Sequence, residues 1–315
     1  MLLAIILIIT GFIILVKGAD FLLDGATSLA KKLAISEIAI GLTVVAFGTS
    51  SPELIVNIIS SLKGHPDICF GNVLGSNIFN ILAVLGVAGL IHPITVLKNT
   101  VRLEIPFVLL GTILVLLLAN NFGMSGHTLY RSDGAILVAS LGLFLIYVLR
   151  MDRNPLTEGY NIVEYPTWKT VIYITLGITG LFLGGEMVVR NAVKIARLMQ
   201  VSEKLIALTI IAFGTSLPEF VTSIIAVTRK RFDLAVGNVI GSNLFNLFMV
   251  LGVTAIINPI FYDPIMNIDV YLSIIITVIL LITMFTGRRR QLDRYEALLF
   301  VLMYIAYIIY IINRR

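Results

Sequence analysis

A proline and a glutamate stand side by side inside an apolar stretch of the sequence, and this arrangement occurs twice. The motif reads GTSSPE at residues 48–53 and GTSLPE at residues 214–219. A carboxylate at membrane depth costs about 2.5–3.5 kcal/mol on insertion scales, so such a residue usually serves a function. The adjacent proline breaks a helix, and broken backbone at that depth survives only where protein buries it or where it lines a cavity. The two copies predict one central site built from two halves.

The composition places the rest of the chain in a bilayer. Of the 315 residues, 58% are hydrophobic and 13% are charged, and the mean hydropathy is +1.00. Soluble chains carry about 25% charged residues. The net charge of +5 therefore indicates membrane loops and no nucleic-acid partner. We predict an all-α polytopic membrane protein with ten transmembrane helices. The expected spans are residues 2–30, 37–61, 70–92, 102–120, 133–150, 168–196, 203–227, 234–257, 267–286 and 294–312.

Cysteine and histidine supply no ligand set for a soft metal. Cys69 is the single cysteine, so it forms neither an intramolecular disulfide nor part of a multi-cysteine site. His65, His92 and His127 are scattered without ligand spacing and are expected to be structural or solvated. The N-terminal apolar run lacks a basic leading region, so we interpret it as a mature helix and not as a signal peptide.

The chain is internally duplicated at a constant offset of 166 residues. Residues 41–53 match residues 207–219 at nine of thirteen positions, and residues 71–80 match residues 237–246 at eight of ten. Each copy holds five spans, which is an odd number, so the two halves must enter the membrane in opposite directions. Such inverted repeats, with broken helices at corresponding positions, are typical of secondary transporters.

The duplication also divides the chain. We predict a first five-helix repeat over residues 1–150, a cytoplasmic connector over 151–167 and a second, inverted five-helix repeat over 168–315. The connector is polar and too short to be a domain, so we expect no regulatory module there.

The distribution of Lys and Arg predicts the orientation. The loops between spans 1–2, 3–4, 5–6, 7–8 and 9–10 carry fourteen of these residues, and the opposite side, with both termini, carries seven. Basic loops face the cytoplasm, so we predict both termini outside the cell membrane. The basic runs 229–231 and 288–290 are interpreted as ordinary cytoplasmic anchors.

The second span should expose oxygen atoms around its break. Pro52 has no N–H, so the Gly48 carbonyl loses its helical partner, and we expect nearby carbonyls such as that of Ala46 to tilt out as well. Ser50 and Glu53 are three residues apart and share a helix face. The seventh span repeats this arrangement over residues 212–219.

The third and eighth spans each carry a polar face next to a pair of glycines. Ser76 and Asn80 are four residues apart, and so are Ser242 and Asn246. The glycine pairs predict close helix packing that brings these faces against the broken helices. The pairs are Gly71 with Gly75 and Gly237 with Gly241, and Asn77 and Asn243 lie on the adjoining helix faces.

These side chains supply only oxygen ligands, which hard cations such as Ca²⁺ and Na⁺ prefer. Two carboxylates match the charge of one Ca²⁺. A single Gly-Thr-Ser run or a single buried glutamate has a structural explanation, in packing or back-bonding, but the duplicated set favours a site. Asp20 and Glu186 lie near Lys17 and Arg190, so we expect them to form structural ion pairs.

With these motifs in place, the sequence resembles the cation/Ca²⁺ exchanger superfamily, and within it the prokaryotic Na⁺/Ca²⁺ exchangers. The two duplicated segments are similar to the two α-repeats of that family, and the likeness spans nearly the whole chain. It implies cation binding among the second, third, seventh and eighth helices, and a sliding of the first and sixth helices during alternating access. The implied ligands are Glu53, Glu219, Thr49, Ser50, Thr215, Ser216, Ser76, Asn80, Ser242 and Asn246, with the main-chain carbonyls of Ala46 and Ala212.

One departure bears on the coupling ion. Several relatives, potassium-dependent exchangers among them, carry Asp where this chain has Asn246, so the resemblance implies a pocket with one negative charge fewer and no potassium coupling. The H⁺/Ca²⁺ branch usually has an acid shortly after Gly-Asn, and residues 71–75 and 237–241 contain none. This favours sodium over protons.

The leading hypothesis is therefore a Na⁺/Ca²⁺ antiporter that is electrogenic and independent of potassium. A H⁺/Ca²⁺ exchanger, or an exchanger of another divalent cation, is the alternative within transport. A cation channel would need an open pore, and an intramembrane hydrolase would need a nucleophile and a base that the motifs lack. We expect Ca²⁺ and Na⁺ to be the transported substrates and the lipid bilayer to be the surroundings. We expect no enzyme activity, no cofactor and no protein partner.

Overall fold

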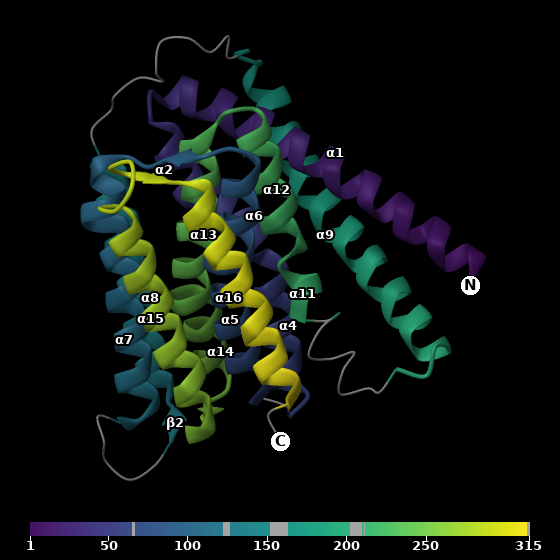
Figure 1. Ribbon diagram of the computed structural model, residues 1–315, viewed down its shortest axis with the longest axis vertical. Helices are drawn as coiled ribbons and strands as arrows, with labels where there is room; N and C mark the ends of the chain where they lie inside the picture. Colours follow the sequence, from purple (N-terminus) through teal and green to yellow (C-terminus); the bar gives the residue numbers. More distant parts are fainter. Residues whose placement is uncertain (65–66, 122–126, 152–162, 202–209, 211, 314–315) are drawn as a thin grey trace.

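The computed structural model describes residues 1–64, 67–121, 127–151, 163–201, 210 and 212–313, which fold almost entirely into helices (Figure 1). The first half contains α1 (Leu2–Leu33), α2 (Glu37–Ile40), η1 (Gly41–Val45), α3 (Ala46–Thr49), α4 (Ser51–Leu62), α5 (Asp67–Phe79), η2 (Asn80–Val84), α6 (Leu85–Ile91), β1 (Ile94–Thr95), η3 (Thr100–Glu104), α7 (Ile105–Ala119), β2 (Thr128–Leu129) and α8 (Arg131–Leu149).

The second half follows the same order. It contains α9 (Thr167–Leu198), α11 (Ala212–Thr215), α12 (Leu217–Thr228), α13 (Phe232–Phe245), η6 (Asn246–Val250), α14 (Leu251–Ile257), β3 (Ile260–Phe261), η7 (Pro264–Met266), α15 (Asn267–Thr283), β4 (Gln291–Leu292) and α16 (Arg294–Asn313). The predicted spans end within a few residues of these helices. The predicted start of the seventh span at residue 203 and most of the predicted connector lie outside the described residues.

Most of these helices are long and apolar enough to cross a bilayer, which makes the chain a multi-span membrane protein. In the described part of the chain eight helices meet this condition singly. A further pair, Glu37–Thr49 with Ser51–Leu62, meets it only when taken together, because each helix is too short alone, and the two are bent by 42° relative to each other. The bend falls beside Pro52, as the sequence predicts.

The offset of 166 residues recurs in the structure. It relates α4 to α12, η2 to η6, α6 to α14 and β1 to β3. The two short antiparallel pairings are matched in the same way: β1 pairs with β4, and β2 with β3, so each pairing joins one strand from each half.

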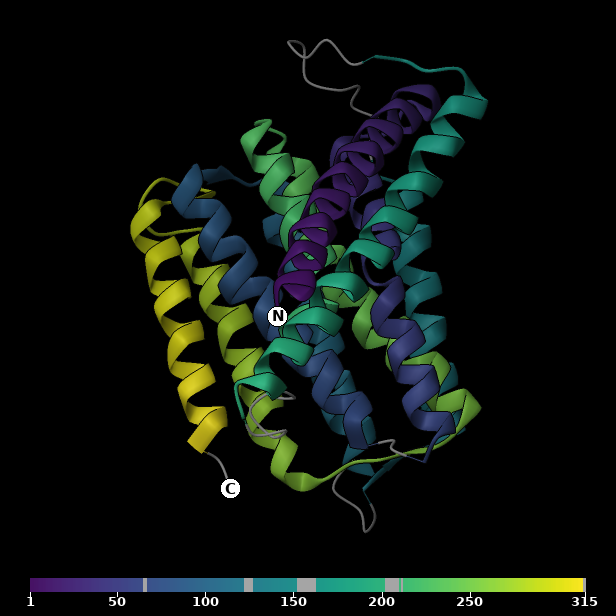
Figure 2. The ribbon, with the colours of Figure 1, turned by 90° about the vertical axis from the view of Figure 1, so that its right-hand side faces the viewer.

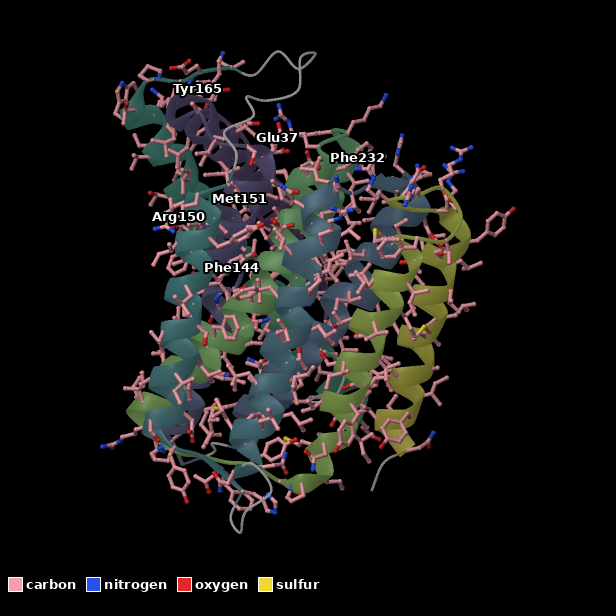
Figure 3. All side chains as sticks on the ribbon, turned by 90° about the vertical axis from the view of Figure 1, so that its left-hand side faces the viewer. Glu37, Phe144, Arg150, Met151, Tyr165 and Phe232 are labelled. Atoms are coloured by element: carbon pink, nitrogen blue, oxygen red, sulfur yellow. The ribbon has the colours of Figure 1, made fainter. Side chains whose placement is uncertain are left out.

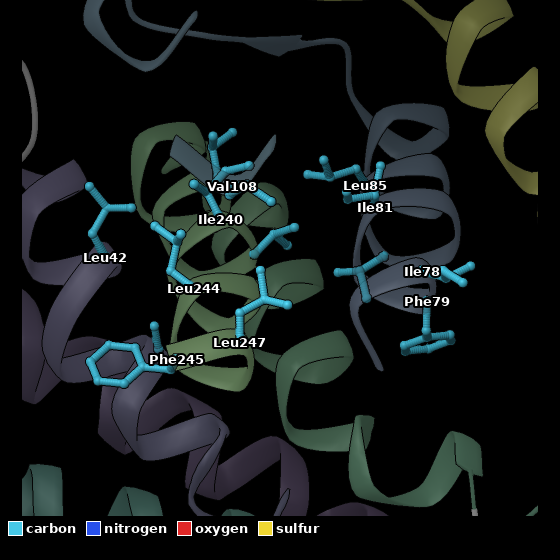
Figure 4. Packing of buried hydrophobic residues seen from close by; sticks show 14 of the residues in the cluster. Leu42, Ile78, Phe79, Ile81, Leu85, Val108, Ile240, Leu244, Phe245 and Leu247 are labelled. Carbon is cyan, nitrogen blue, oxygen red and sulfur yellow. The ribbon is translucent and has the colours of Figure 1, made fainter. Parts of the chain in front are cut away.

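Two long central helices form the core. The first runs over Ile68–Ile91 and the second over Phe232–Ile257, and 78% and 83% of their most apolar stretches are buried, against 17–44% for the other single spans. Figure 4 shows Leu85 on the first helix pointing toward the second, which carries Ile240 and Leu244. The polar faces predicted on the third and eighth spans therefore lie inside the protein and not in lipid.

Five-residue wide turns interrupt the central helices. The turns η2 and η6 begin at Asn80 and Asn246, two of the predicted ligands, and η1 lies in the first half of the second span. Such π-type turns are frequent at functional sites, because they tilt carbonyls and side chains away from the regular helical pattern.

The helices α1 and α9 lie side by side and slant across one side of the bundle (Figures 1 and 2). Glycines let their backbones touch: a Cβ on Gly18 would lie 2.7 Å from the Leu181 nitrogen, and one on Gly177 would lie 2.5 Å from the Leu22 nitrogen. The expected close approach at Gly237 and Gly241 also occurs, against residues 38–46 of the second span. Gly71 and Gly75 are the counterparts of these glycines in the first half. Their expected contact segment is residues 204–212, which lie almost wholly outside the described residues.

The basic run 229–231 does more than anchor the protein. Arg229 at the end of α12 pairs with Asp20 and Asp24 of α1, at 2.5 Å and 2.7 Å, so Asp20 pairs more closely with Arg229 than with Lys17, which is 3.8 Å away.

Arg231 pairs with Glu37, which lies with Phe232 at one end of the molecule (Figure 3). The ion pair expected between Glu186 and Arg190 is absent, although both residues are described. Both side chains are exposed, and an exposed ion pair gains little free energy, so its loss costs the fold little.

The glycine contact between α1 and α9 predicts the effect of adding one methyl group. Gly177→Ala should destabilise the folded protein by about 1–3 kcal/mol, because its Cβ meets the backbone of Leu22, which cannot move aside. Thermal unfolding of the purified protein measures this. Gly142→Ala is the matched control, since no described atom lies within 4 Å of its Cβ, and equal melting temperatures for the two variants would contradict the packing described here.

Candidate functional site

The two broken helices each present a glutamate at the start of a new helix. Ser50 interrupts the first at φ −84° and ψ 1°, and Ser216 interrupts the second at φ −92° and ψ 7°. Proline follows within the first two helical positions of both, where its missing N–H costs nothing. Glu53 and Glu219 therefore lie in the first turn of α4 and α12, where the positive end of the helix dipole favours a negative charge.

The glutamates are hydrogen-bonded across the two halves. The Ser50 hydroxyl donates to Glu219 Oε1 over 3.2 Å, and the Ser216 hydroxyl donates to Glu53 Oε1 over 3.3 Å. Ser76 of α5 donates to the same Glu53 oxygen over 3.5 Å. All five side chains are at most 1% exposed, so the two halves meet at a buried cluster.

Four asparagines form a second cross-linked group one helical turn further on. Asn80 Nδ2 donates to Asn243 Oδ1, and Asn246 Nδ2 donates to Asn77 Oδ1, both over 3.1 Å. The four amides come from the two central helices, and every one is fully buried. The structure therefore brings the predicted ligands Asn80 and Asn246 together through two residues, Asn77 and Asn243, that were expected only to lie beside them.

Several oxygens of these residues have no hydrogen-bond partner. In the described part of the chain five buried carboxylate or amide oxygens lack one, and four of the five belong to predicted ligands. They are Glu53 Oε2, Glu219 Oε2, Asn80 Oδ1 and Asn246 Oδ1. A buried acceptor without a partner costs about 1–3 kcal/mol, and more when it is charged. Acceptors of this kind need a cation or a donor, and a hard cation satisfies several of them at once.

The threonines are hydrogen-bonded to a further pair of asparagines. The Thr49 hydroxyl donates to Asn238 Oδ1 over 3.0 Å and lies 3.1 Å from Ser242 Oγ, and the Thr215 hydroxyl donates to Asn72 Oδ1 over 3.2 Å. Sequence reasoning passed over Asn72 and Asn238. Their identity in both copies of the duplicated segment was the signal that could have found them.

Asn57 and Ser223 lie behind these asparagines. Asn72 donates to Asn57 Oδ1 over 2.7 Å, and Asn238 donates to Ser223 Oγ over 2.9 Å. Asn57 and Ser223 therefore position the side-chain amides of Asn72 and Asn238, which accept the hydrogen bonds of Thr215 and Thr49.

The two alanine carbonyls differ in what the structure describes. The Ala46 oxygen accepts a hydrogen bond from the Ser50 nitrogen at 2.9 Å, and the Thr49 hydroxyl oxygen lies 3.3 Å away. Contrary to the expectation, this carbonyl is therefore not released from the helix. The break lies at Ser50, one turn later, so the helical bond to Ala46 is still made. Ala212 opens α11, and its side chain lies outside the described residues.

Comparison with known proteins finds relatives over almost the full chain. The family model described as "Sodium/calcium exchanger protein" matches residues 3–150 and 169–313. The putative antiporter CaxA of Alkalimonas amylolytica is 37% identical over 98% of both chains. The sodium/calcium exchanger MaX1 of Methanosarcina acetivorans is 29% identical over 96% of this chain and 97% of its own.

A solved structure has the same fold. It is that of the sodium-calcium exchanger NCX_Mj soaked with Na⁺ and Ca²⁺, and it superposes with a TM-score of 0.81 and 30% sequence identity over 99% of both chains. The matched region therefore covers the residues of the two proline-containing spans and of both central helices.

The unpartnered carboxylate oxygens predict that a cation stabilises the folded protein. Ca²⁺ added in sodium-free buffer should raise the melting temperature, since a ligand at a hundred times its Kd adds about 2.7 kcal/mol. Glu53→Gln and Glu219→Gln should each lose this shift, because each removes half of the negative charge. Glu104→Gln is the matched control: Glu104 is also fully buried with an unpartnered Oε2, but it lies in η3 and accepts a hydrogen bond from Tyr147. A Ca²⁺ shift that survives in both site variants would contradict the assignment.

Proposed function

Since the chain belongs to the sodium/calcium exchanger family, we propose that it is a secondary antiporter that exchanges Na⁺ for Ca²⁺ across the cell membrane by alternating access. The observation that carries this proposal is the set of four buried, unpartnered oxygens contributed by both halves of the chain. A protein that must bind and then release a dehydrated cation needs such acceptors, and a purely structural cluster would satisfy them internally.

The proposed ligands are those of the two broken helices and the two central helices. Glu53 and Glu219 supply the charge, and the hydroxyls and amides around them supply neutral oxygens. The neutral ligands are Thr49, Ser50, Thr215, Ser216, Ser76, Asn80, Ser242 and Asn246, with the carbonyl of Ala212; the Ala46 carbonyl, which is bonded within its helix here, would first have to give up that bond. Ca²⁺ and Na⁺ are the substrates, and the proposed activity needs no cofactor, nucleic acid or protein partner.

The proposed architecture is ten spans in two inverted five-helix repeats, over residues 1–150 and 168–315, joined by a cytoplasmic connector over 151–167. The eight single spans, the bent pair and the half-span α12 support this count. The reciprocal strand pairings and the recurring offset support the duplication.

Sodium coupling is supported by the lack of an acid shortly after the two Gly-Asn pairs, in residues 71–75 and 237–241. Asn72 and Asn238 are amides already hydrogen-bonded to the two threonines, so they supply no proton carrier of their own. With Asn246 also neutral, the site has two carboxylates, which one Ca²⁺ neutralises. Three Na⁺ would leave one positive charge, so a three-for-one exchange moves one net charge in each cycle. The proposed ligand set contains no further acid to balance a co-transported K⁺.

Transport in proteoliposomes tests the coupling. An imposed sodium gradient should drive Ca²⁺ uptake without K⁺, and the uptake should respond to a clamped membrane potential, because moving one charge is worth about 2.3 kcal/mol per 100 mV. Glu53→Gln vesicles serve as the inactive control. An absolute requirement for K⁺, or a flux indifferent to potential, would refute the charge count. Uptake driven by a proton gradient alone would instead support H⁺/Ca²⁺ exchange.

Cysteine labelling tests the orientation that the excess of basic residues predicts, with both termini outside. On a background in which Cys69 is replaced by alanine, a membrane-impermeant thiol reagent applied from outside should label Arg315→Cys and should miss Arg289→Cys. Permeabilised cells provide the control that both positions can react. Labelling of Arg289→Cys alone in intact cells would reverse the orientation.

A further inference from the structure

The four buried asparagines are linked by hydrogen bonds whose donors and acceptors can be assigned in only one way. Asn77 Nδ2 donates to the main-chain oxygen of Asn243 over 3.2 Å, and Asn243 Nδ2 donates to the main-chain oxygen of Asn77 over 3.4 Å. A carbonyl oxygen only accepts, so each of these side chains must turn its nitrogen toward the backbone. Its Oδ1 then faces the amide of the other half's ligand residue.

That orientation determines the orientation of the ligand amides. Asn77 Oδ1 can only accept, so Asn246 must present its Nδ2 there, at 3.1 Å, which leaves Asn246 Oδ1 as the free end. The mirror arrangement holds Asn80 through Asn243, also at 3.1 Å, and leaves Asn80 Oδ1 free. Without this control an asparagine could turn by half a rotation and present its NH₂ group, which repels a cation.

We propose that Asn77 and Asn243 are positioning residues that select the oxygen end of the two ligand amides, each acting on the ligand of the opposite half. The inference rests on the proposed function, in which Asn80 and Asn246 bind the cation. It deepens that function by giving a defined role to the two neutral residues behind the site. They do not touch the ion, but they decide which end of a ligand amide does.

An aspartate at position 246 distinguishes this positioning role of Asn77 from a role in packing alone. Aspartate has oxygens at both ends, so at position 246 it presents an oxygen whichever way it turns, and it no longer needs Asn77. In the Asn246→Asp protein Asn77 Oδ1 would even face another oxygen at about the present 3.1 Å, so removing Asn77 there relieves a repulsion. A packing role would make the loss of Asn77 equally harmful in both backgrounds.

The test is a double-mutant cycle on the full-length purified protein, with Ca²⁺ binding measured by calorimetry and the KM for Ca²⁺ measured in proteoliposomes. Asn77→Ala should weaken Ca²⁺ binding at least tenfold in the parent protein, which is about 1.4 kcal/mol, and should raise KM more than it lowers kcat. In the Asn246→Asp background the same change should alter binding by less than threefold or improve it. An equal loss in both backgrounds would overturn the inference.

Three controls complete the experiment. Thr112→Val removes a buried hydroxyl that bonds within its own helix α7, and it should leave Ca²⁺ binding unchanged. The mirror cycle, Asn243→Ala with Asn80→Asp, should give the same pattern. If neither Asn77→Ala nor Asn243→Ala yields folded protein in any background, the residues are structural and the inference is wrong. A parent protein that binds no more Ca²⁺ than Glu53→Gln would instead refute the proposed function itself.

Discussion

The bilayer offers no water to a buried carboxylate, and the structure depends on how the protein compensates for that. Each glutamate accepts a hydrogen bond from a serine of the opposite half, Ser50 for Glu219 and Ser216 for Glu53. The same serines are the residues at which the helices break, so one position both ends a helix and donates to the partner carboxylate. Neither half can complete its polar cluster alone, and the two halves must fold around each other.

The compensation remains incomplete at the oxygens that face inward. The donor groups of the serines, the threonines, Asn77 and Asn243 are all engaged in hydrogen bonds within the cluster. Acceptor oxygens without a donor are left at Glu53, Glu219, Asn80 and Asn246. A fully satisfied network would be rigid and inert. A network with more acceptors than donors can bind a cation at its unpaired oxygens, and an exchanger of cations requires this property.

The sequence predicted the spans, the breaks and the polar residues because each depends on spacing along one helix. Pro52 and Pro218 mark the interruptions, and the spacing of Ser76 and Asn80 puts both on one face. Contacts between helices could not be predicted, because the helical period does not say which distant residue faces a given side chain. The crossed bonds of Asn77 and the pairing of Arg229 with α1 belong to this class. The wide turns that begin at Asn80 and Asn246 also escaped prediction, because their residues read as an ordinary apolar helix.

The contact between α1 and α9 has a mechanical consequence. Gly18 lies against the backbone of Leu181, and Gly177 lies against that of Leu22, so neither helix can shift along the other without forcing main-chain atoms together. The main chains therefore hold the two helices together as one unit, which Arg229 ties to the bundle through partly exposed ion pairs with Asp20 and Asp24 of α1. Because α1 comes from the first half and α9 from the second, we expect a chain cut in the connector to transport ions only after its two fragments have reassociated along these glycines.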